Sequence, residues 1–256
     1  MVQASRQKFC IFLHGLDIDQ NFQRIFNQTP FLKDIRISQT LPEQQLLPMQ
    51  HALTPALTHF GWTPLQMRYR SELPFPVAAD FLHADLMTLA NRHHWRYDNT
   101  VWIGYSTGGL VARSLFAKFR YPCTKLLTLA TPHCGLLDFA SIFSPVPAAA
   151  AMLRNSRELN WLNNHPVDIS ARPRYRFHGV SFNGMFGFDY HDDDGLVPIT
   201  SAMGLELQPR PEGMGRIHLA NRTHAPLDGL VHMKELLEPS CIMPFIDDCQ
   251  FALQHH

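Results

Sequence analysis

Hydrophobic residues in this chain form short continuous runs that alternate with longer stretches of helical period. The runs predict buried strands at Phe9 to Leu13, Leu65 to Tyr69, Thr100 to Ile103, Lys125 to Leu129, Arg174 to Val180 and Arg216 to Leu219. Apolar residues spaced three or four positions apart predict helices at Asn21 to Phe31, Gln44 to Phe60, Val77 to Ala90, Gly108 to Phe119, Asp228 to Leu237 and Ile242 to Leu253. Strands that alternate with helices are typical of an α/β fold, with a mostly parallel central sheet and helices on both faces.

Two segments interrupt this alternation. The Pro-rich stretch from Ser71 to Asp80 predicts a loop, and the Pro- and Ala-rich stretch from Ser141 to Met152 predicts an insertion between two strands. The length of 256 residues suits one domain of this class, and no internal repeat divides it. We therefore expect a single domain over residues 1–256, with ligand sites beyond the carboxyl ends of the strands.

The charge balance argues against a nucleic-acid partner. Lys plus Arg number 22 and Asp plus Glu also number 22, so no overall field attracts polyanions. The charged fraction is only 17%, which leaves room for a transient contact with a membrane or lipid surface. The alternating Arg172, Arg174 and Arg176 predict a solvated strand face rather than an anion site.

Cysteine usage and the N-terminal residues bear on location. Five cysteines without Cys-x-x-Cys spacing predict buried thiols in a reducing compartment, rather than a disulfide framework or a zinc ribbon. The first apolar run, Phe9 to Leu13, is too short for a signal peptide or a membrane span. We expect a cytoplasmic protein, with a leader removed before Met1 as the open alternative. The sequence leaves the oligomeric state undetermined.

The stretch Gly104-Tyr105-Ser106-Thr107-Gly108 matches the pattern Gly-x-Ser-x-Gly. A predicted buried strand ends at the first glycine and a predicted helix begins at the second, which is the setting that the motif requires of a catalytic serine. The hydroxyl of Ser106 would project near the positive end of the helix dipole. We therefore predict Ser106 as a nucleophile. The alternative is a strand-to-helix turn that simply favours small residues.

A serine nucleophile requires a base, and the base requires an orienting acid. Three adjacent carboxylates follow the strand that ends near Val180. Asp194 is favoured as the acid because apolar residues follow it directly, while Asp192 and Asp193 are its rivals and Asp189 is a remoter one. A solvated acidic loop or a weak calcium site is the alternative interpretation of this cluster.

Fifteen histidines compete for the role of the base. His224 is favoured because it lies in a loop between a short predicted strand and a predicted helix. His218 and His232 lie inside those elements and are expected to be structural. The backbone N–H groups of Leu16 and Thr107 are the predicted oxyanion donors, because one follows the first strand and the other follows the nucleophile.

Five segments resemble the α/β-hydrolases of the lipase and esterase kind: "FLHGL", "IGYSTGGLVAR", "LATPHCG", "DDDGLVPITSA" and "RTHAPL". The resemblance extends from near Phe9 to about Leu237. It implies a compact α/β-hydrolase fold with Ser106 as nucleophile, Asp194 as acid, His224 as base, and Leu16 and Thr107 as oxyanion donors. It also implies a small lid over about 136–166, which is short for an enzyme that acts on fat droplets.

The predicted function is a serine carboxylic ester hydrolase that forms an acyl-enzyme from a small-molecule ester with an apolar acyl group. Such a mechanism needs no metal and no cofactor. An acyltransferase, a thioesterase or a peptidase with the same triad is the alternative, and a non-catalytic module that binds lipid or protein is a further one. The residues expected to contact the substrate are His14, Tyr105, Phe139, Phe143, Met185 and Phe186.

Overall fold

The computed structural model describes residues 7–16, 46–93, 97–121, 123–182, 193–194, 196–219, 240 and 242–256. Several sequence predictions lie outside these residues: the helices at 21–31 and 228–237, and the site residues Met185, Phe186, Asp189, Asp192 and His224.

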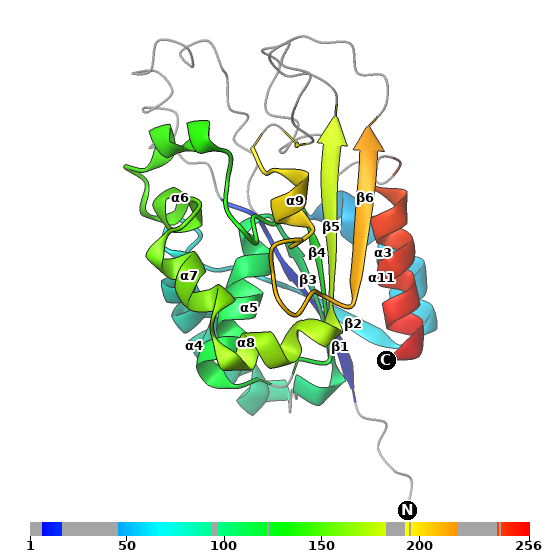
Figure 1. The fold of residues 1–256 in the computed structure, drawn as a ribbon. Coiled ribbons are helices and arrows are strands. Elements are labelled where there is room, and N and C mark those ends of the chain that lie inside the picture. Colours follow the sequence, from blue (N-terminus) through cyan, green and yellow to red (C-terminus); the bar gives the residue numbers. More distant parts are fainter. Residues whose placement is uncertain are drawn as a thin grey trace, which may run out of the picture.

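The described core is a sheet of six parallel strands in the order β2-β1-β3-β4-β5-β6 (Figure 1). The strands are β1 (Lys8–Leu13), β2 (Trp62–Met67), β3 (Thr100–Tyr105), β4 (Lys125–Leu129), β5 (Tyr175–Phe182) and β6 (Gly213–Leu219). Every residue of β3 and β4 is buried, as expected for central strands covered on both faces. The predicted α/β fold with a mostly parallel sheet is therefore confirmed.

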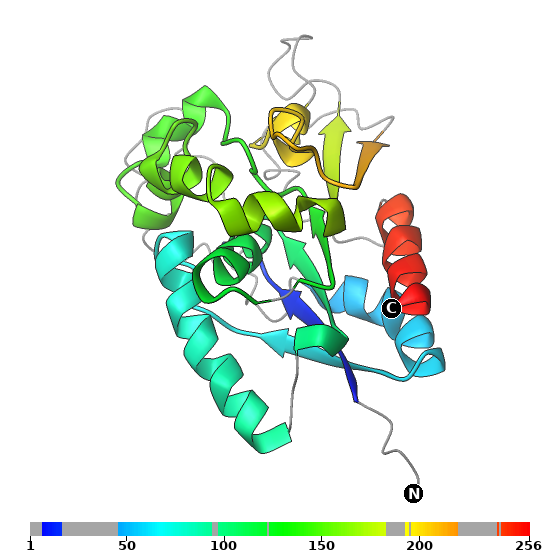
Figure 2. The same cartoon turned by 60° about the horizontal axis from the view of Figure 1, so that its bottom comes forward.

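Helices cover both faces of this sheet (Figures 1 and 2). α3 (Leu47–His59) and α11 (Met243–His255) pack on one face, and α4 (Phe75–His93) and α5 (Thr107–Phe119) pack on the other. Successive strand residues point to opposite faces, so Trp102 joins the apolar cluster beneath α4 and α5 while Ile103 joins the cluster beneath α3 and α11. This alternation explains why the central strands carry apolar residues toward both faces of the sheet.

The connection from β4 to β5 is mostly helical. It contains η2 (Asp138–Phe143), α6 (Pro147–Met152), α7 (Arg157–Asn163), α8 (Pro166–Ala171) and η3 (Arg172–Arg174). The other short elements are η1 (Tyr97–Asn99) and α9 (Ile199–Ala202). α7 and α8 contact α5, so the segment for which the sequence predicts a lid lies beside the helix that follows Ser106 (Figure 1).

Two sequence predictions misplaced element boundaries at prolines. β2 begins at Trp62 rather than Leu65 and includes Pro64, which lacks an N–H group. Within the described sheet β2 pairs only with β1, and an edge strand tolerates proline. The loop expected over 71–80 is wrong in its second half, because α4 begins at Phe75 and Pro76 occupies its first turn, where no N–H donor is needed.

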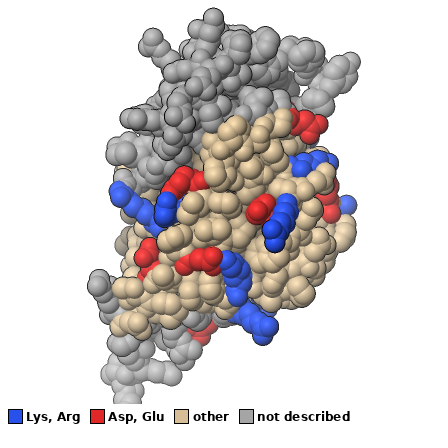
Figure 3. All heavy atoms as spheres, turned by 90° about the vertical axis from the view of Figure 1, so that its left-hand side faces the viewer, with Lys and Arg blue, Asp and Glu red and all other residues tan. Residues whose placement is uncertain are grey.

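Three observations concern the thiols, the surface charges and the helices of the described residues. Cys10, Cys123, Cys134 and Cys249 are free and buried, which confirms the prediction of buried thiols for these four. Basic and acidic side chains are interspersed on the face shown in Figure 3. Within the described part of the chain, none of the helices combines the length and the apolar character that crossing a bilayer requires.

Candidate active site

The strand order places the carboxyl ends of β1 and β3 side by side at the point where the order reverses. β1 lies between β2 and β3, and Leu13 pairs with Gly104 at the ends of the two strands. The helix before β2 packs on one face of the sheet and the helix after β3 packs on the other. The connections that follow β1 and β3 therefore lie on opposite faces of the sheet, and open α/β sheets bind their ligands at such a point. Both the predicted nucleophile and the loop that carries Leu16 follow these two strand ends.

Ser106 is held in a left-handed backbone conformation between β3 and α5, with φ of 51° and ψ of −126°. Its N–H donates to the carbonyl of Leu129 (2.9 Å), and its own carbonyl accepts from the N–H of Gly109 (3.2 Å) and from the hydroxyl of Thr131 (2.7 Å). Such a conformation costs on the order of 1–3 kcal/mol in a residue with a side chain and occurs preferentially at active sites. The surrounding contacts thus hold Ser106 in the geometry of a nucleophile on a strand-to-helix turn.

The two glycines of the motif are required by close backbone approach. A Cβ atom on Gly104 would lie 2.7 Å from the Cα of Gly109, inside the first turn of α5. A Cβ atom on Gly108 would lie 2.3 Å from the carbonyl oxygen of Leu13 and 2.5 Å from that of His14. These distances are far below normal contact, so α5 can pack against the end of β1 only when these positions carry no side chain. The glycines therefore bring the Ser106 turn and the loop after β1 together.

The predicted oxyanion residues flank Ser106 on both sides. Thr107 is the first residue of α5, and its hydroxyl donates to the sulfur of Met152 on α6 (3.2 Å). On the other side, a Cβ atom on Gly15 would lie 3.1 Å from the Cβ of Ser106, so the His14-Gly15-Leu16 loop lies directly against the predicted nucleophile. The structure brings these segments together as the sequence predicts. Their role as oxyanion donors stays a prediction.

The predicted acid, Asp194, is fully buried in a tight turn. Its Oδ1 accepts from the N–H groups of Leu196 (3.1 Å) and Val197 (2.8 Å), and a bridge between Asp193 and Pro198 closes the turn. Burial raises the pKa of Tyr105 well above its usual value, and the negative charge of Asp194 raises it further. Asp194 thus lies near the residue that precedes Ser106. Its partner in the predicted triad, His224, lies outside the described residues.

The residues expected to contact substrate have different surroundings. His14 and Tyr105 are buried, 1% and 3% exposed, in the wall around the Ser106 turn. Phe139 and Phe143 fall within η2. Contact of any of these residues with a substrate stays a prediction.

Among the described residues, no three His, Cys, Asp or Glu side chains gather closely enough to hold a metal ion.

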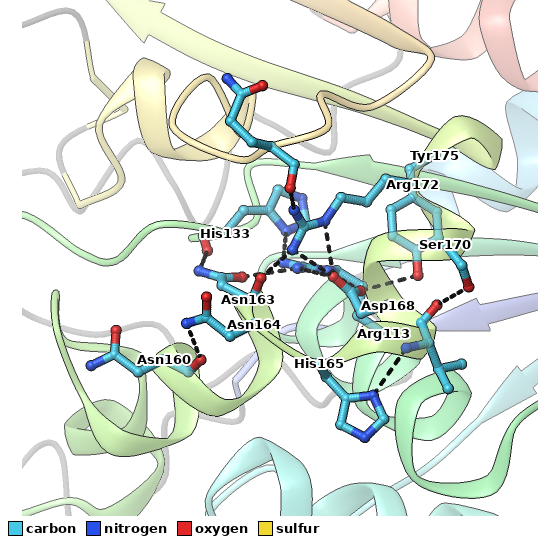
Figure 4. A network of polar contacts seen from close by, with 12 residues as sticks. Arg113, His133, Asn160, Asn163, Asn164, His165, Asp168, Ser170, Arg172 and Tyr175 are labelled. Atoms are coloured by element: carbon cyan, nitrogen blue, oxygen red, sulfur yellow. Dashed lines mark hydrogen bonds and ion pairs between the residues drawn. The ribbon is translucent and has the colours of Figure 1, made fainter.

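A buried polar network links α5 to α8 and to Asn163, which lies near the end of the segment predicted as a lid (Figure 4). Arg113 on α5 donates from Nε and Nη2 to the two carboxylate oxygens of Asp168 on α8, at 2.9 and 2.7 Å. Its Nη1 donates to Nδ1 of His133 (3.1 Å). Burial opposes the charge of Arg113, but the carboxylate of Asp168 outweighs this effect and raises the pKa of Arg113. Burial also holds the pKa of His133 well below its usual value, so this imidazole is a neutral acceptor.

Arg172 completes this network and corrects a sequence prediction. Arg172 and Arg174 belong to η3 rather than to the strand, and Arg172 is only 1% exposed, so a solvated face is wrong for this residue. Its Nε donates to Asp168 (3.1 Å) and its Nη1 to the carbonyl of Gln208 (2.6 Å). The network therefore fixes α8 against α5 through charges that are removed from water.

Sequence reasoning missed two further residues at the site. Thr131, whose hydroxyl holds the Ser106 carbonyl, lies in the "LATPHCG" segment that carries part of the resemblance. Tyr69 follows β2, and its hydroxyl donates to the carbonyl of His14. The only signal in the sequence was the position of each residue just after a strand, where functional groups of such sheets gather.

Comparisons with known proteins agree with this architecture. A scan against protein-family models and a search of curated proteins both find no match. Among solved structures, the mature form of lipase BlEst2 from Bacillus licheniformis matches with a TM-score of 0.54 and 15% identity, covering 94% of this chain and 93% of that one. The chain spans only 50% of the propeptide form of the same lipase.

Two other solved structures extend the comparison. Phospholipase PlaB from Legionella pneumophila matches with a TM-score of 0.57 and 14% identity, covering 97% of this chain and 60% of that one. An α/β hydrolase superfamily protein from Enterococcus faecalis matches with a TM-score of 0.52 and 12% identity, covering 99% of this chain and 93% of that one. At these identities the likeness concerns the fold, and the chain has the α/β-hydrolase fold.

Proposed function

We propose that this chain, which has the α/β-hydrolase fold, is a serine carboxylic ester hydrolase acting on small-molecule esters with apolar acyl groups. The observation that carries the proposal is the backbone of Ser106. A non-glycine residue at φ of 51° is held there by three hydrogen bonds and by two glycines that allow no side chain. A turn that merely needed small residues would place glycine at this strained position.

In the proposed mechanism His224 removes the proton from Ser106 Oγ as that oxygen attacks the ester carbonyl. Asp194 orients His224 and stabilises its charged form. The N–H groups of Leu16 and Thr107 bind the oxyanion of the tetrahedral intermediate. The alcohol leaves with a proton from His224, and water then hydrolyses the acyl-enzyme by the same steps. The strained turn and the rigid Asp194 loop both favour this preorganised arrangement.

The proposed apolar acyl group is supported by the surroundings of the Ser106 turn. Met152 contacts Thr107, and Leu136 and Val146 are buried in the same segment. Two structural neighbours are a lipase and a phospholipase, which also supports an ester or lipid substrate. We propose that residues 136–166 form a cap of a single domain, anchored to α5 by the hydrogen bond from Arg113 to Asn163 (2.9 Å).

The proposal is tested by replacing Ser106 with alanine and measuring hydrolysis of short and medium p-nitrophenyl esters. We expect turnover to be abolished while the fold is retained, because the variant lacks the oxygen atom that is proposed to accept the acyl group. Ser114→Ala is the matched control, since Ser114 is a buried serine of α5, the helix that follows Ser106, and its hydroxyl lacks a hydrogen-bond partner within the described structure. Turnover in Ser106→Ala equal to that of the control would disprove the mechanism.

The acid assignment has its own comparison. Asp194→Asn is expected to lower kcat by orders of magnitude, because the members of a triad act as a unit. Asp192→Asn, which alters the neighbouring carboxylate, is expected to have a much smaller effect. If Asp192→Asn is the more damaging change, Asp194 is not the acid.

A further inference from the structure

The loop after β1 has two of its carbonyl groups fixed by side chains. The imidazole of His14 donates from Nδ1 to the carbonyl of Gly15 (2.6 Å), and the hydroxyl of Tyr69 donates to the carbonyl of His14. Tyr69 lies 55 residues further along the chain, just after β2. The conformation of the loop therefore depends on a side chain from a different strand.

Fixing a carbonyl also fixes the next N–H group. In a planar trans peptide the C=O and the N–H of the same unit point in opposite directions. The His14 imidazole, by holding the Gly15 carbonyl, thus determines the direction of the Leu16 N–H. Tyr69, by holding the His14 carbonyl, determines the plane of the peptide unit between His14 and Gly15. The orientation of this unit in turn affects the position of the next one, between Gly15 and Leu16.

Tyr69 also supports the imidazole that makes the first of these bonds. The rings of Tyr69 and His14 stack with centroids 4.3 Å apart and planes 10° from parallel. Burial, assisted by the nearby charge of Arg68, lowers the pKa of His14 to about 4, although the hydrogen bond to Gly15 acts in the opposite direction. His14 is therefore neutral near pH 7, with Nδ1 carrying the proton that it donates to Gly15. The stacked phenol keeps this ring in its donating orientation.

The point at which Tyr69 acts is in contact with the Ser106 turn. A Cβ atom on Gly108 would lie 2.5 Å from the His14 carbonyl oxygen, the same atom that accepts from Tyr69. A Cβ atom on Gly15 would lie 3.1 Å from the Cβ of Ser106. A displacement of the His14 carbonyl therefore changes the spacing between the loop and Ser106 directly.

We propose that Tyr69 is a positioning residue for oxyanion stabilisation, holding His14 so that the Leu16 N–H faces the reacting carbonyl beside Ser106. This inference rests on the proposed function. Tyr69 itself touches no reacting atom in this account. It acts through the His14 carbonyl with its hydroxyl and through the His14 imidazole with its ring. Loss of Tyr69 should therefore weaken binding of the transition state more than binding of the substrate.

The test is the Tyr69→Phe variant, which retains the ring stack and removes only the hydroxyl. We expect kcat for a p-nitrophenyl ester to fall about tenfold while KM changes less than about twofold, since deleting a whole oxyanion donor costs about a hundredfold or more. Tyr69→Ala, which also removes the stack, should lose more. Tyr121→Phe is the matched control. Tyr121 follows the C-terminal end of α5, and its hydroxyl also contacts a histidine, His83 of α4. That control should keep the kcat of the wild type.

Two measurements keep the result interpretable. Titration to completion with a fluorophosphonate counts reactive enzyme in each sample, so a partly unfolded variant is still compared per active site. Binding of a trifluoromethyl ketone, which mimics the tetrahedral intermediate, should weaken in parallel with kcat/KM. An unchanged kcat in Tyr69→Phe, an equal loss in Tyr121→Phe, or a raised KM at constant kcat would overturn the inference. Absence of turnover and labelling in the wild type would instead overturn the proposed function, and this inference with it.

Discussion

Gly108→Ala adds one methyl group at the contact between the Ser106 turn and the loop after β1. The new Cβ would lie 2.3 Å from the Leu13 carbonyl oxygen and 2.5 Å from that of His14. Real contacts of this kind are not shorter than 3.0 Å, so the two segments must separate by at least about 0.7 Å. Both obstacles are backbone atoms of a buried strand end, so no side-chain rotation can relieve them.

The size of the expected effect follows from that displacement. A misplacement of about 1 Å at a reacting centre costs on the order of a hundredfold in rate, so kcat/KM for a p-nitrophenyl ester should fall between about tenfold and a hundredfold. Alanine is favoured over glycine inside a helix by up to about 1 kcal/mol. Overpacking costs about 1–3 kcal/mol, so we also expect a net loss of unfolding free energy.

Gly61→Ala is the control for this experiment. Gly61 has φ of +71° just after α3, and a Cβ atom there would meet nothing within 4 Å. The control should lose about 1 kcal/mol of stability through backbone strain alone and retain full activity. Wild-type kcat/KM in Gly108→Ala, measured on folded protein, would refute the account of how the glycines position Ser106.

Two further predictions concern stability. Asp168→Asn should lower the free energy of unfolding in urea by about 3–5 kcal/mol, because it leaves the buried Arg113 and Arg172 without their carboxylate. Asp80→Asn, which breaks the exposed ion pair with Lys118, should lower it by less than about 1 kcal/mol. Equal losses in the two variants would contradict the assigned role of Asp168. The pKa of His14 is near its usual value of 6.5 in the unfolded chain and about 4 in the folded protein. The neutral imidazole therefore contributes its full stabilisation above pH 6.5, and this contribution is lost as the pH falls toward 4. We expect this residue to account for a loss of about 2 kcal/mol between pH 7 and pH 5, and an equally steep pH dependence in His14→Gln would contradict that assignment.

The parts of the fold that could be predicted are those encoded by local pattern. β4 begins and ends where the predicted run Lys125 to Leu129 does, because three leucines in five residues mark a short strand that is buried on both faces. α5 follows the predicted helix to within one residue for the same kind of reason. The strand-to-helix turn at Ser106 was predictable because such a turn needs glycines at fixed offsets, and five consecutive residues meet that requirement.

The parts that could not be predicted depend on residues distant in the chain. Asp168 is an unremarkable acid in sequence, and its burial makes sense only when Arg113, 55 positions earlier, lies beside it. Tyr69 likewise acquires its role from His14, and Thr131 from Ser106. Pro64 misled the strand boundary because local propensity does not reveal that β2 lies at an edge of the described sheet.

We propose that Oγ of Ser106 is the atom that accepts the acyl group. The most direct measurement is the intact mass of the wild type and of Ser106→Ala after treatment with a fluorophosphonate, with Ser114→Ala as control. We predict one adduct on the wild type and on Ser114→Ala, mapped to the peptide that contains Ser106, and none on Ser106→Ala. An adduct on Ser106→Ala, or an unlabelled wild type, would contradict the claim.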